Sequence, residues 1–144
     1  MPPNLVAATV RQGLFTRIVG RRLLYYPELS STMDEAAKLG EGDAEEGVVV
    51  VAEVQRAGRG RQGRSWVSQP GNLLVSVLFR PTLEALPFIS IIGGIAAARA
   101  VRKVSGLDPK IKCPTTCSSA DSKPLASWPR VRSPGIPYGM LCSA

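Results

Sequence analysis

The chain has 144 residues, of which 44% are hydrophobic and 20% charged, with a formal net charge of +7 and a pI near 9.8. This composition is ordinary for a globular protein, and the length allows one domain with a modest core. The positive charge favours anionic partners such as a nucleic acid, a membrane surface or a phosphorylated small molecule. The absence of histidine excludes the commonest general base and metal ligand.

The elements expected in chain order are a helix over Leu5–Ile18, a strand over Arg22–Tyr26, a helix from Ser31 to Leu39, strands over Gly47–Val54 and Asn72–Phe79, a helix over Phe88–Val104 and a strand over Lys110–Lys112. The helices follow from apolar residues at helical spacing, and the strands from β-branched runs. Ser31 is expected to cap the second helix, with Asp34 as the partner carboxylate and Gly40 as the stop.

Targeting signals are not evident. The first four residues, Met-Pro-Pro-Asn, lack a basic region that leads into an apolar run. The apolar stretch Phe88–Val101 is too short to span a bilayer and contains Arg99. We therefore expect a cytoplasmic protein without a membrane partner.

The sequence changes character after Lys112. The last 32 residues hold five prolines, six serines and all three cysteines, but only four residues that are Leu, Ile or Val. So little apolar surface does not offset the entropy of ordering, which predicts a disordered tail over residues 113–144. Cys113 and Cys117 form a lone Cys-x-x-x-Cys, and without a second pair or a histidine this spacing is a weak metal signal.

The most informative segment is the Gly/Arg loop, residues 55–66, with the sequence Gln-Arg-Ala-Gly-Arg-Gly-Arg-Gln-Gly-Arg-Ser-Trp. Its glycines, at positions 58, 60 and 63, are expected to allow positive φ and close approach to a ligand. Its arginines can make bidentate contacts to carboxylate or phosphate. Such a loop can close over a reactive anionic intermediate and exclude water.

The Gly/Arg loop does not match two common phosphate-binding motifs. The loop lacks the Gly-Lys-Ser/Thr ending of a Walker phosphate loop, and no helix follows it as in a dinucleotide fingerprint. An exposed basic loop, or an Arg-Gly segment that binds single-stranded RNA, remains open from composition alone. The predicted strands on both sides favour a lid over an active site, because Arg-Gly segments for nucleic acid are normally repeated and lack flanking strands.

Three motifs together resemble the biotin–protein ligase family. Residues 52–66, with Gly-Arg-Gly-Arg-x-Gly-Arg at their centre, match its signature. Residues 30–36 (Ser-Ser-Thr-Met-Asp-Glu-Ala) resemble its Ser-Thr-Asn motif, and residues 71–76 (Gly-Asn-Leu-Leu-Val-Ser) resemble the strand after the loop. Order and spacing agree over about residues 20–112. The resemblance implies an α+β fold, a mixed β-sheet with flanking helices, here incomplete: residues 1–112 correspond to the N-terminal part of the catalytic domain.

The resemblance implies a two-step ligation. Biotin and MgATP form biotinyl-5'-AMP with loss of pyrophosphate, and the biotinyl group passes to a lysine of a biotin carboxyl-carrier protein. ATP, Mg²⁺ and biotin are thus the expected small molecules, with no metal ligands assigned in the chain. At the positions that match the family's motifs, the resemblance implies that the residues binding biotin and the adenylate are Ser31, Thr32, Gln55, Gly58, Arg59, Gly60, Arg61 and Trp66. It implies that the catalytic residues are Arg59 and Arg61.

Several of these residues have simpler readings. Ser31 is also a good helix cap, and Trp66 could pack in the core. Arg56 and Arg64 are expected to be solvated or to support the loop. Met33 departs from the asparagine of the family motif, so a polar contact there is not expected.

The loss of a single base would account for the start of the tail. The family continues after this strand with Lys-Trp-Pro-Asn-Asp, a lysine and Gly-Ile-Leu. Loss of one base from the tryptophan codon of TGG-CCC-AAC-GAC-GTG-CTC-CTC gives TGC-CCA-ACG-ACG-TGC-TCC-TC, which encodes the Cys-Pro-Thr-Thr-Cys-Ser-Ser found at residues 113–119. The same shift permits a lysine near Lys123 and Gly-Ile-Leu-Ala-Glu-Gly around residues 126–132. We therefore hypothesise that residues 113–144 are out of frame.

Two alternative functions stay open at this point. One is a lipoate or octanoyl transfer enzyme of the same superfamily, against which the Gly-Arg-Gly-Arg-x-Gly-Arg loop argues. The other is a basic RNA-binding module. About 20 residues precede the first catalytic strand, too few for a helix–turn–helix, so we expect no DNA partner and no repressor activity.

Overall fold

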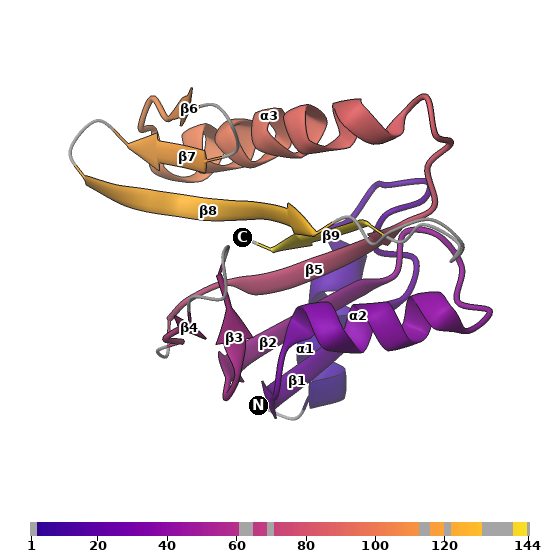
Figure 1. Ribbon diagram of the computed structural model, residues 1–144. Coiled ribbons are helices and arrows are strands. Elements are labelled where there is room, and N and C mark those ends of the chain that lie inside the picture. Colours follow the sequence, from indigo (N-terminus) through magenta and orange to yellow (C-terminus); the bar gives the residue numbers. More distant parts are fainter. Residues whose placement is uncertain are drawn as a thin grey trace.

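The computed structural model describes residues 3–60, 65–68, 71–112, 116–119, 122–130 and 140–143. The helices are α1 (Pro3–Gln12), α2 (Thr32–Glu41) and α3 (Leu86–Ser105) (Figure 1). The strands are β1 (Leu23–Leu29), β2 (Val49–Gln55), β3 (Gly58–Arg59), β4 (Ser65–Trp66), β5 (Leu74–Phe79), β6 (Lys110–Lys112), β7 (Thr116–Ser119), β8 (Ser122–Arg130) and β9 (Met140–Ser143).

The described strands form a mixed sheet in the order β1-β2-β5-β9-β8-β7-β6, with β3 and β4 as a separate two-stranded ribbon. The strands β1 and β2 are parallel and are connected through α2, whereas β2 and β5 are antiparallel. Helix α2 packs on β2, β5 and β9, and α3 contacts β6, β7 and β8. The expected α+β fold with a mixed sheet and flanking helices is confirmed.

The first helix is shorter than expected, because a tertiary contact ends it. The prediction carried it to Ile18, but α1 ends at Gln12. The following segment brings the Ile18 carbonyl against Gly47, which has φ +86°, and a Cβ at Gly47 would lie 2.2 Å from that oxygen. The Gly20 amide also donates to the Gly47 carbonyl at 2.8 Å. A helix continued to Ile18 would not allow this turn.

The second helix runs past its predicted stop. Gly40 lies inside α2, which ends at Glu41. Gly40 is buried, and a Cβ there would lie 3.1 Å from Leu78 Cδ1, so the glycine serves close packing on β5 rather than helix termination. The carbonyl groups at the end of α2 are instead bonded by the Arg80 side chain.

The core lies between α2 and the first three strands of the sheet. Its buried hydrophobic side chains are Ala36, Val48, Val49, Val50, Ala52, Leu74 and Leu78. Residues of β5 alternate between buried and half-buried, as expected for a strand with one face on a helix. Three polar side chains, those of Ser31, Thr32 and Ser76, are buried in the same region. Their burial marks the place where the core meets the candidate site.

The expected disorder of residues 113–144 stays a prediction, since the structure describes only parts of this tail. The structure describes strands at 116–119, 122–130 and 140–143, and β9 pairs with β5 at Leu78 and Phe79. Backbone pairing does not depend on apolar side chains, so these segments find partners along the open edge of the sheet. The pairing is irregular, with register shifts between β7 and β8 and between β8 and β9. Cys113 lies outside the described residues.

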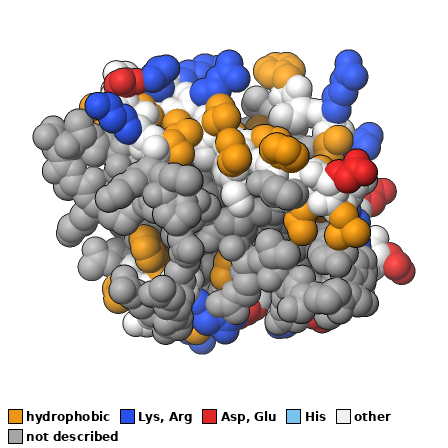
Figure 2. Space-filling view, turned by 45° about the horizontal axis from the view of Figure 1, so that its top comes forward, with side chains coloured by type: hydrophobic (Ala, Val, Ile, Leu, Met, Phe, Trp, Pro, Cys, Tyr) orange, Lys and Arg blue, Asp and Glu red, His pale blue; other side chains and the backbone are white. Residues whose placement is uncertain are grey.

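Helix α3 is apolar as predicted, but much of its apolar surface is exposed. The exposed fractions are 58% for Phe88, 60% for both Ile91 and Ile92, and 44% for Ile95. Figure 2 shows hydrophobic side chains gathered with Lys and Arg side chains on the face toward the viewer. Within the described part of the chain, no helix has the length and apolar character needed to cross a membrane.

Candidate ligand site at the ends of β1 and β2

The candidate site forms where β1 and β2 end. Because these strands are parallel, their carboxyl ends lie at the same edge of the sheet. Ser31 and Thr32 follow β1, and Gln55 is the last residue of β2. The Gly/Arg loop begins there, since the Arg56 amide donates to the Leu29 carbonyl at 3.0 Å and the Ala57 amide to the Ser30 carbonyl at 2.9 Å. The loop therefore starts beside the N-terminus of α2.

Ser31 caps α2 as predicted. It is 2% exposed, has extended φ and ψ, and its Oγ accepts a hydrogen bond from the Asp34 amide at 3.4 Å. The expected role of the Asp34 carboxylate is wrong. That carboxylate is paired with the Arg59 guanidinium, so the ion pair across the site replaces a local bond within the cap. The N-terminus of α2 and the Gly/Arg loop are thus connected by charge.

A buried hydrogen-bond chain connects β5, α2 and β2. Gln55 Oε1 accepts from the Thr32 amide at 2.6 Å and from the Thr32 hydroxyl at 2.8 Å. Ser76 donates to Thr32 Oγ1 at 2.9 Å. Thr32 and Ser76 are fully buried, whereas Gln55 is half-buried and reaches the edge of the site.

Gly58 allows the loop to lie close to Gln55. Its Cβ, if present, would be 2.8 Å from the Trp66 carbonyl oxygen and 3.1 Å from Gln55 Nε2. Gly58 pairs with Trp66 in the β3–β4 ribbon. The expectation of positive φ is wrong for Gly58 and Gly60, since neither has it. Close approach of backbone to backbone, and not a left-handed conformation, is what requires glycine at position 58.

Two exposed ion pairs hold the described part of the Gly/Arg loop. Arg56 Nε lies 2.5 Å from Glu28 Oε1, and this hydrogen bond is the main reason that the Glu28 pKa is lowered. Arg59 pairs with Asp34. The side chains are 73% and 42% exposed at Arg56 and Arg59, so both pairs are accessible to water. Arg56 therefore supports the loop, as expected.

The sequence model of the biotin/lipoate A/B protein ligase family matches residues 25–122 of this chain. The chain belongs to this family. It is 37% identical over 116 residues to the bifunctional ligase/repressor BirA of Bacillus subtilis, covering 78% of this chain and 36% of the relative. It is 32% identical over 104 residues to the biotin–protein ligase of Homo sapiens, covering 65% of this chain and 14% of the relative. The chain thus spans about a third or less of these relatives.

Solved structures of the family share the fold. The biotin protein ligase of Leishmania major in complex with biotinyl-5-AMP superposes with a TM-score of 0.72 at 28% identity, over 85% of this chain and 56% of that one. The biotin protein ligase of Aquifex aeolicus in complex with biotin and ATP gives a TM-score of 0.69 at 25% identity, over 84% and 50%. The recognition of the biotin–protein ligase family from the sequence is confirmed.

The structure brings together most of the residues expected from the sequence. Ser31, Thr32, Gln55, Gly58 and Arg59 lie around one sheet edge, whereas Arg61 lies outside the described residues, as do Gly63 and Arg64. The alternative of Trp66 as core packing is wrong, since it is 40% exposed in β4.

Two residues at the site were not foreseen. Ser76 was missed, although a serine between the inward-facing Leu74 and Leu78 of an alternating strand was a usable signal. Asp34 was expected only as a cap partner, and nothing in its local sequence indicated a pairing with Arg59.

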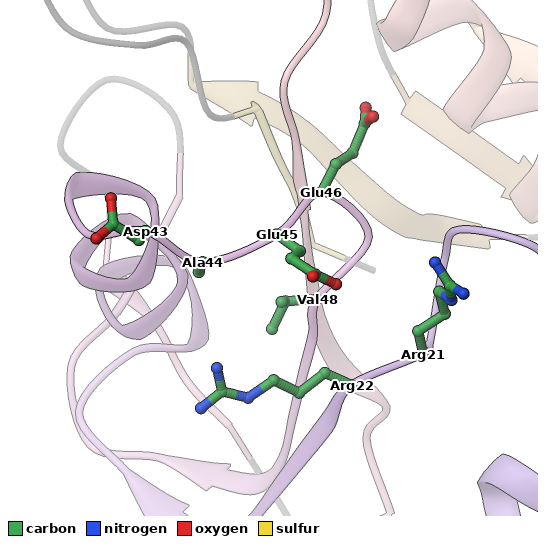
Figure 3. A pocket seen from close by; sticks show the side chains of 7 residues that line it. All are labelled: Arg21, Arg22, Asp43, Ala44, Glu45, Glu46 and Val48. Atoms are coloured by element: carbon green, nitrogen blue, oxygen red, sulfur yellow. The ribbon is translucent and has the colours of Figure 1, made fainter.

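A separate pocket lies at the opposite end of β1 and β2. It has a volume of about 210 Å³ and is lined by Arg21, Arg22, Asp43, Ala44, Glu45, Glu46 and Val48 (Figure 3). Its charges have both signs, so it does not favour a phosphorylated ligand. Among the described residues there is no group of three or more His, Cys, Asp or Glu side chains able to hold a metal ion.

Proposed function

We propose that this domain forms biotinyl-5'-AMP from biotin and ATP and passes the biotinyl group to a lysine of a biotin carboxyl-carrier protein. The observation that carries the proposal is the meeting of Thr32, Gln55 and the arginine-bearing loop at one sheet edge. In the first step a biotin carboxylate oxygen attacks the α-phosphorus of ATP and pyrophosphate leaves. In the second step the lysine amine attacks the acyl carbon, and AMP leaves.

Each residue has a defined task in this proposal. Ser31 and Thr32 contact the biotin rings at the N-terminus of α2, and Gln55 binds the biotin or acyl-adenylate region. Gly58, Arg59, Gly60 and Arg61 enclose the carboxylate and phosphate, and Trp66 packs beside the adenylate. The partial exposure of Trp66 leaves a ring surface for such packing. The guanidinium groups of Arg59 and Arg61 stabilise the charge that develops on the α-phosphate as pyrophosphate leaves.

Loop closure in this proposal requires an exchange of partners. Arg59 is bound to Asp34 in the structure, and a phosphate must take the place of this carboxylate to engage the guanidinium. The exchange costs little because the pair is exposed, and exposed ion pairs contribute roughly 0–1 kcal/mol. Arg56 can stay on Glu28 and keep the base of the loop in position.

The test is ligand binding by a protein made from a gene whose reading frame is restored at codon 113. Calorimetric titration with biotin, biotinyl-5'-AMP and lipoate should give binding to the first two and none to the third. Arg59→Ala should weaken biotinyl-5'-AMP more than biotin, because biotin lacks the phosphate. Preferential binding of lipoate would favour the lipoate or octanoyl transfer function. Salt-sensitive RNA binding without biotin binding would favour an RNA-binding module.

We further propose that residues 113–144 are out-of-frame translation and that the chain as written does not complete catalysis. One observation supports this. The apolar face of α3 is largely exposed, as expected where a hydrophobic surface has lost its cover. Sequencing of the gene decides the first part. If no insertion of a single base near codon 113 restores Trp-Pro-Asn-Asp, the frameshift hypothesis is wrong. Detectable adenylate formation by the purified chain contradicts the second part.

The remaining expectations concern location and partners. The proposal places the reaction in the cytoplasm, where ATP and a carrier protein are both available. The absence of a DNA partner stays a prediction, because the chain spans only 36% of the Bacillus subtilis ligase/repressor.

A further inference from the structure

The hydrogen-bond chain from Ser76 through Thr32 to Gln55 has a single possible direction. The backbone amide of Thr32 can only donate, so the Gln55 atom 2.6 Å from it is the acceptor Oε1. That oxygen lies 2.8 Å from Thr32 Oγ1, and the Thr32 hydroxyl must therefore donate its one proton to it. Thr32 Oγ1 is then left to accept, and the Ser76 hydroxyl donates to it. One backbone N–H thus determines the orientation of all three side chains.

This direction determines what Gln55 offers to a ligand. Two donors from Thr32 occupy its Oε1, so the part of the amide left for other partners is the donor Nε2. The Gly58 backbone lies close to this nitrogen, and a Cβ there would lie 3.1 Å from it, so a side chain at position 58 would crowd the donor. A ligand at this place must present a hydrogen-bond acceptor.

The hydrogen bond to Thr32 is the role that the structure gives to a serine at position 76. It lies on the inward face of β5 between the buried Leu74 and Leu78, and it is fully buried itself. Burial of a hydroxyl is unfavourable unless it is hydrogen-bonded, so an alanine would fill the same position at lower cost. The bond to Thr32 is the use that the structure gives to the hydroxyl.

We propose that Ser76 is a positioning residue which, through Thr32, holds the Gln55 amide with its Nε2 toward the ligand, so that the site selects an acceptor oxygen of a carbonyl or carboxylate. The proposal rests on the proposed function for the identity of the ligand, biotin. Ser76 does not touch the ligand. Its effect on binding passes through Gln55.

The first experiment needs no ligand and uses the 144-residue chain. In Gln55→Glu a carboxylate oxygen replaces Oε1 and can accept the same two bonds at the N-terminus of α2, where negative charge is favourable. The thermal midpoint should therefore stay level or rise. Gln55→Ala leaves the Thr32 amide without this acceptor, and its midpoint should fall. Equal falls in both variants would overturn the assigned direction.

The second experiment measures biotin affinity by calorimetry for the chain and, in parallel, for the frame-restored protein. Gln55→Glu should lose more than tenfold in affinity while it remains folded, because a carboxylate cannot donate. Ser76→Ala should lose about fivefold, as expected for one net hydrogen bond. In the Gln55→Ala background, Ser76→Ala should have no further effect. Thr32→Ser keeps the hydroxyl and should retain affinity, whereas Thr32→Val should not.

The outcomes separate the two proposals. Equal affinity losses for Ser76→Ala with and without Gln55 would show a merely structural role and overturn the positioning role. Retained biotin affinity in Gln55→Glu would overturn selection for an acceptor. Failure of both wild-type proteins to bind biotin overturns the proposed function and, with it, the choice of ligand. The comparison of thermal midpoints still decides the direction of the hydrogen bonds from Ser76 through Thr32 to Gln55.

Discussion

Replacement of Arg80 should destabilise the protein from the end of α2 that is far from the ligand site. The Arg80 guanidinium donates to the carbonyl oxygens of Gly40 at 3.1 Å, Gly42 at 3.0 Å and Ala44 at 3.1 Å, and its Nε donates to Ala44 at 3.2 Å. Gly40 lies in the last turn of α2, Gly42 is its C-cap and Ala44 lies just beyond it, so the guanidinium lies where the helix dipole is negative and orphan acceptors are expected. A cation there both satisfies acceptors and offsets the dipole.

The expected loss of unfolding free energy depends on how the Arg80 donors are shared among the carbonyl groups. A hydrogen bond to a charged group contributes about 1.5–3 kcal/mol when it stands alone. Here one Nη2 serves three carbonyls and the side chain is half-buried, so water can replace part of the loss. We expect Arg80→Met to lower the free energy of unfolding by about 2 kcal/mol, which corresponds to a fall of roughly 6 °C in Tm for a domain of this size. Arg80→Lys keeps the charge and should lose about half as much.

The assay is urea unfolding followed by far-UV circular dichroism. Arg102→Met is the matched control, because Arg102 forms an exposed ion pair with Asp108, with exposed fractions of 64% and 72%. That pair should contribute less than about 0.5 kcal/mol. A loss in Arg80→Met no larger than in Arg102→Met would refute the capping role.

Three more predictions concern the ligand site. Gly58→Ala places a Cβ 2.8 Å from a carbonyl oxygen of β4 and should lower biotin affinity at least about tenfold by calorimetry; unchanged affinity would show that the ribbon can adjust. Asp34→Asn removes the competitor for Arg59 and should tighten biotinyl-5'-AMP binding several-fold, so weaker binding contradicts the partner exchange. Arg56 lowers the Glu28 pKa, so the pair stabilises the folded state above the usual carboxyl pKa and loses this effect as pH falls through the lowered value. The difference in unfolding free energy between wild type and Glu28→Gln should therefore exist at neutral pH and vanish in acid; a difference that persists there means another cause.

Local signals in the sequence were sufficient for the elements around the site. The Ser31 cap, the two β-branched strands and the apolar α3 were each visible within a short window, and the structure contains all of them. The family motif added the assignment of Thr32 and Gln55 to one site. Their contact spans 23 positions, and it depends on β1 and β2 being parallel, which no local pattern shows.

The errors have a common physical cause, which is that tertiary contacts outweighed local preference. The helix predicted to reach Ile18 ends early because that residue packs on Gly47. The Asp34 carboxylate pairs with the opposite charge of Arg59 instead of bonding within the helix cap. Ser76 and Thr32 are 44 positions apart, so alternation along β5 could place Ser76 inward but could not name its partner.

The parallel pairing of β1 and β2 also separates the binding residues from the turn between α2 and β2. Glu45 and Glu46 are exposed in that turn, at the end of the strands away from Thr32 and Gln55. A backbone cleavage between these two glutamates would therefore leave the ligand groups on two fragments that still share a six-residue-pair strand register. Two fragments divided there and expressed together should reassemble. Binding of biotin by the mixture, but by neither fragment alone, would show that they have done so.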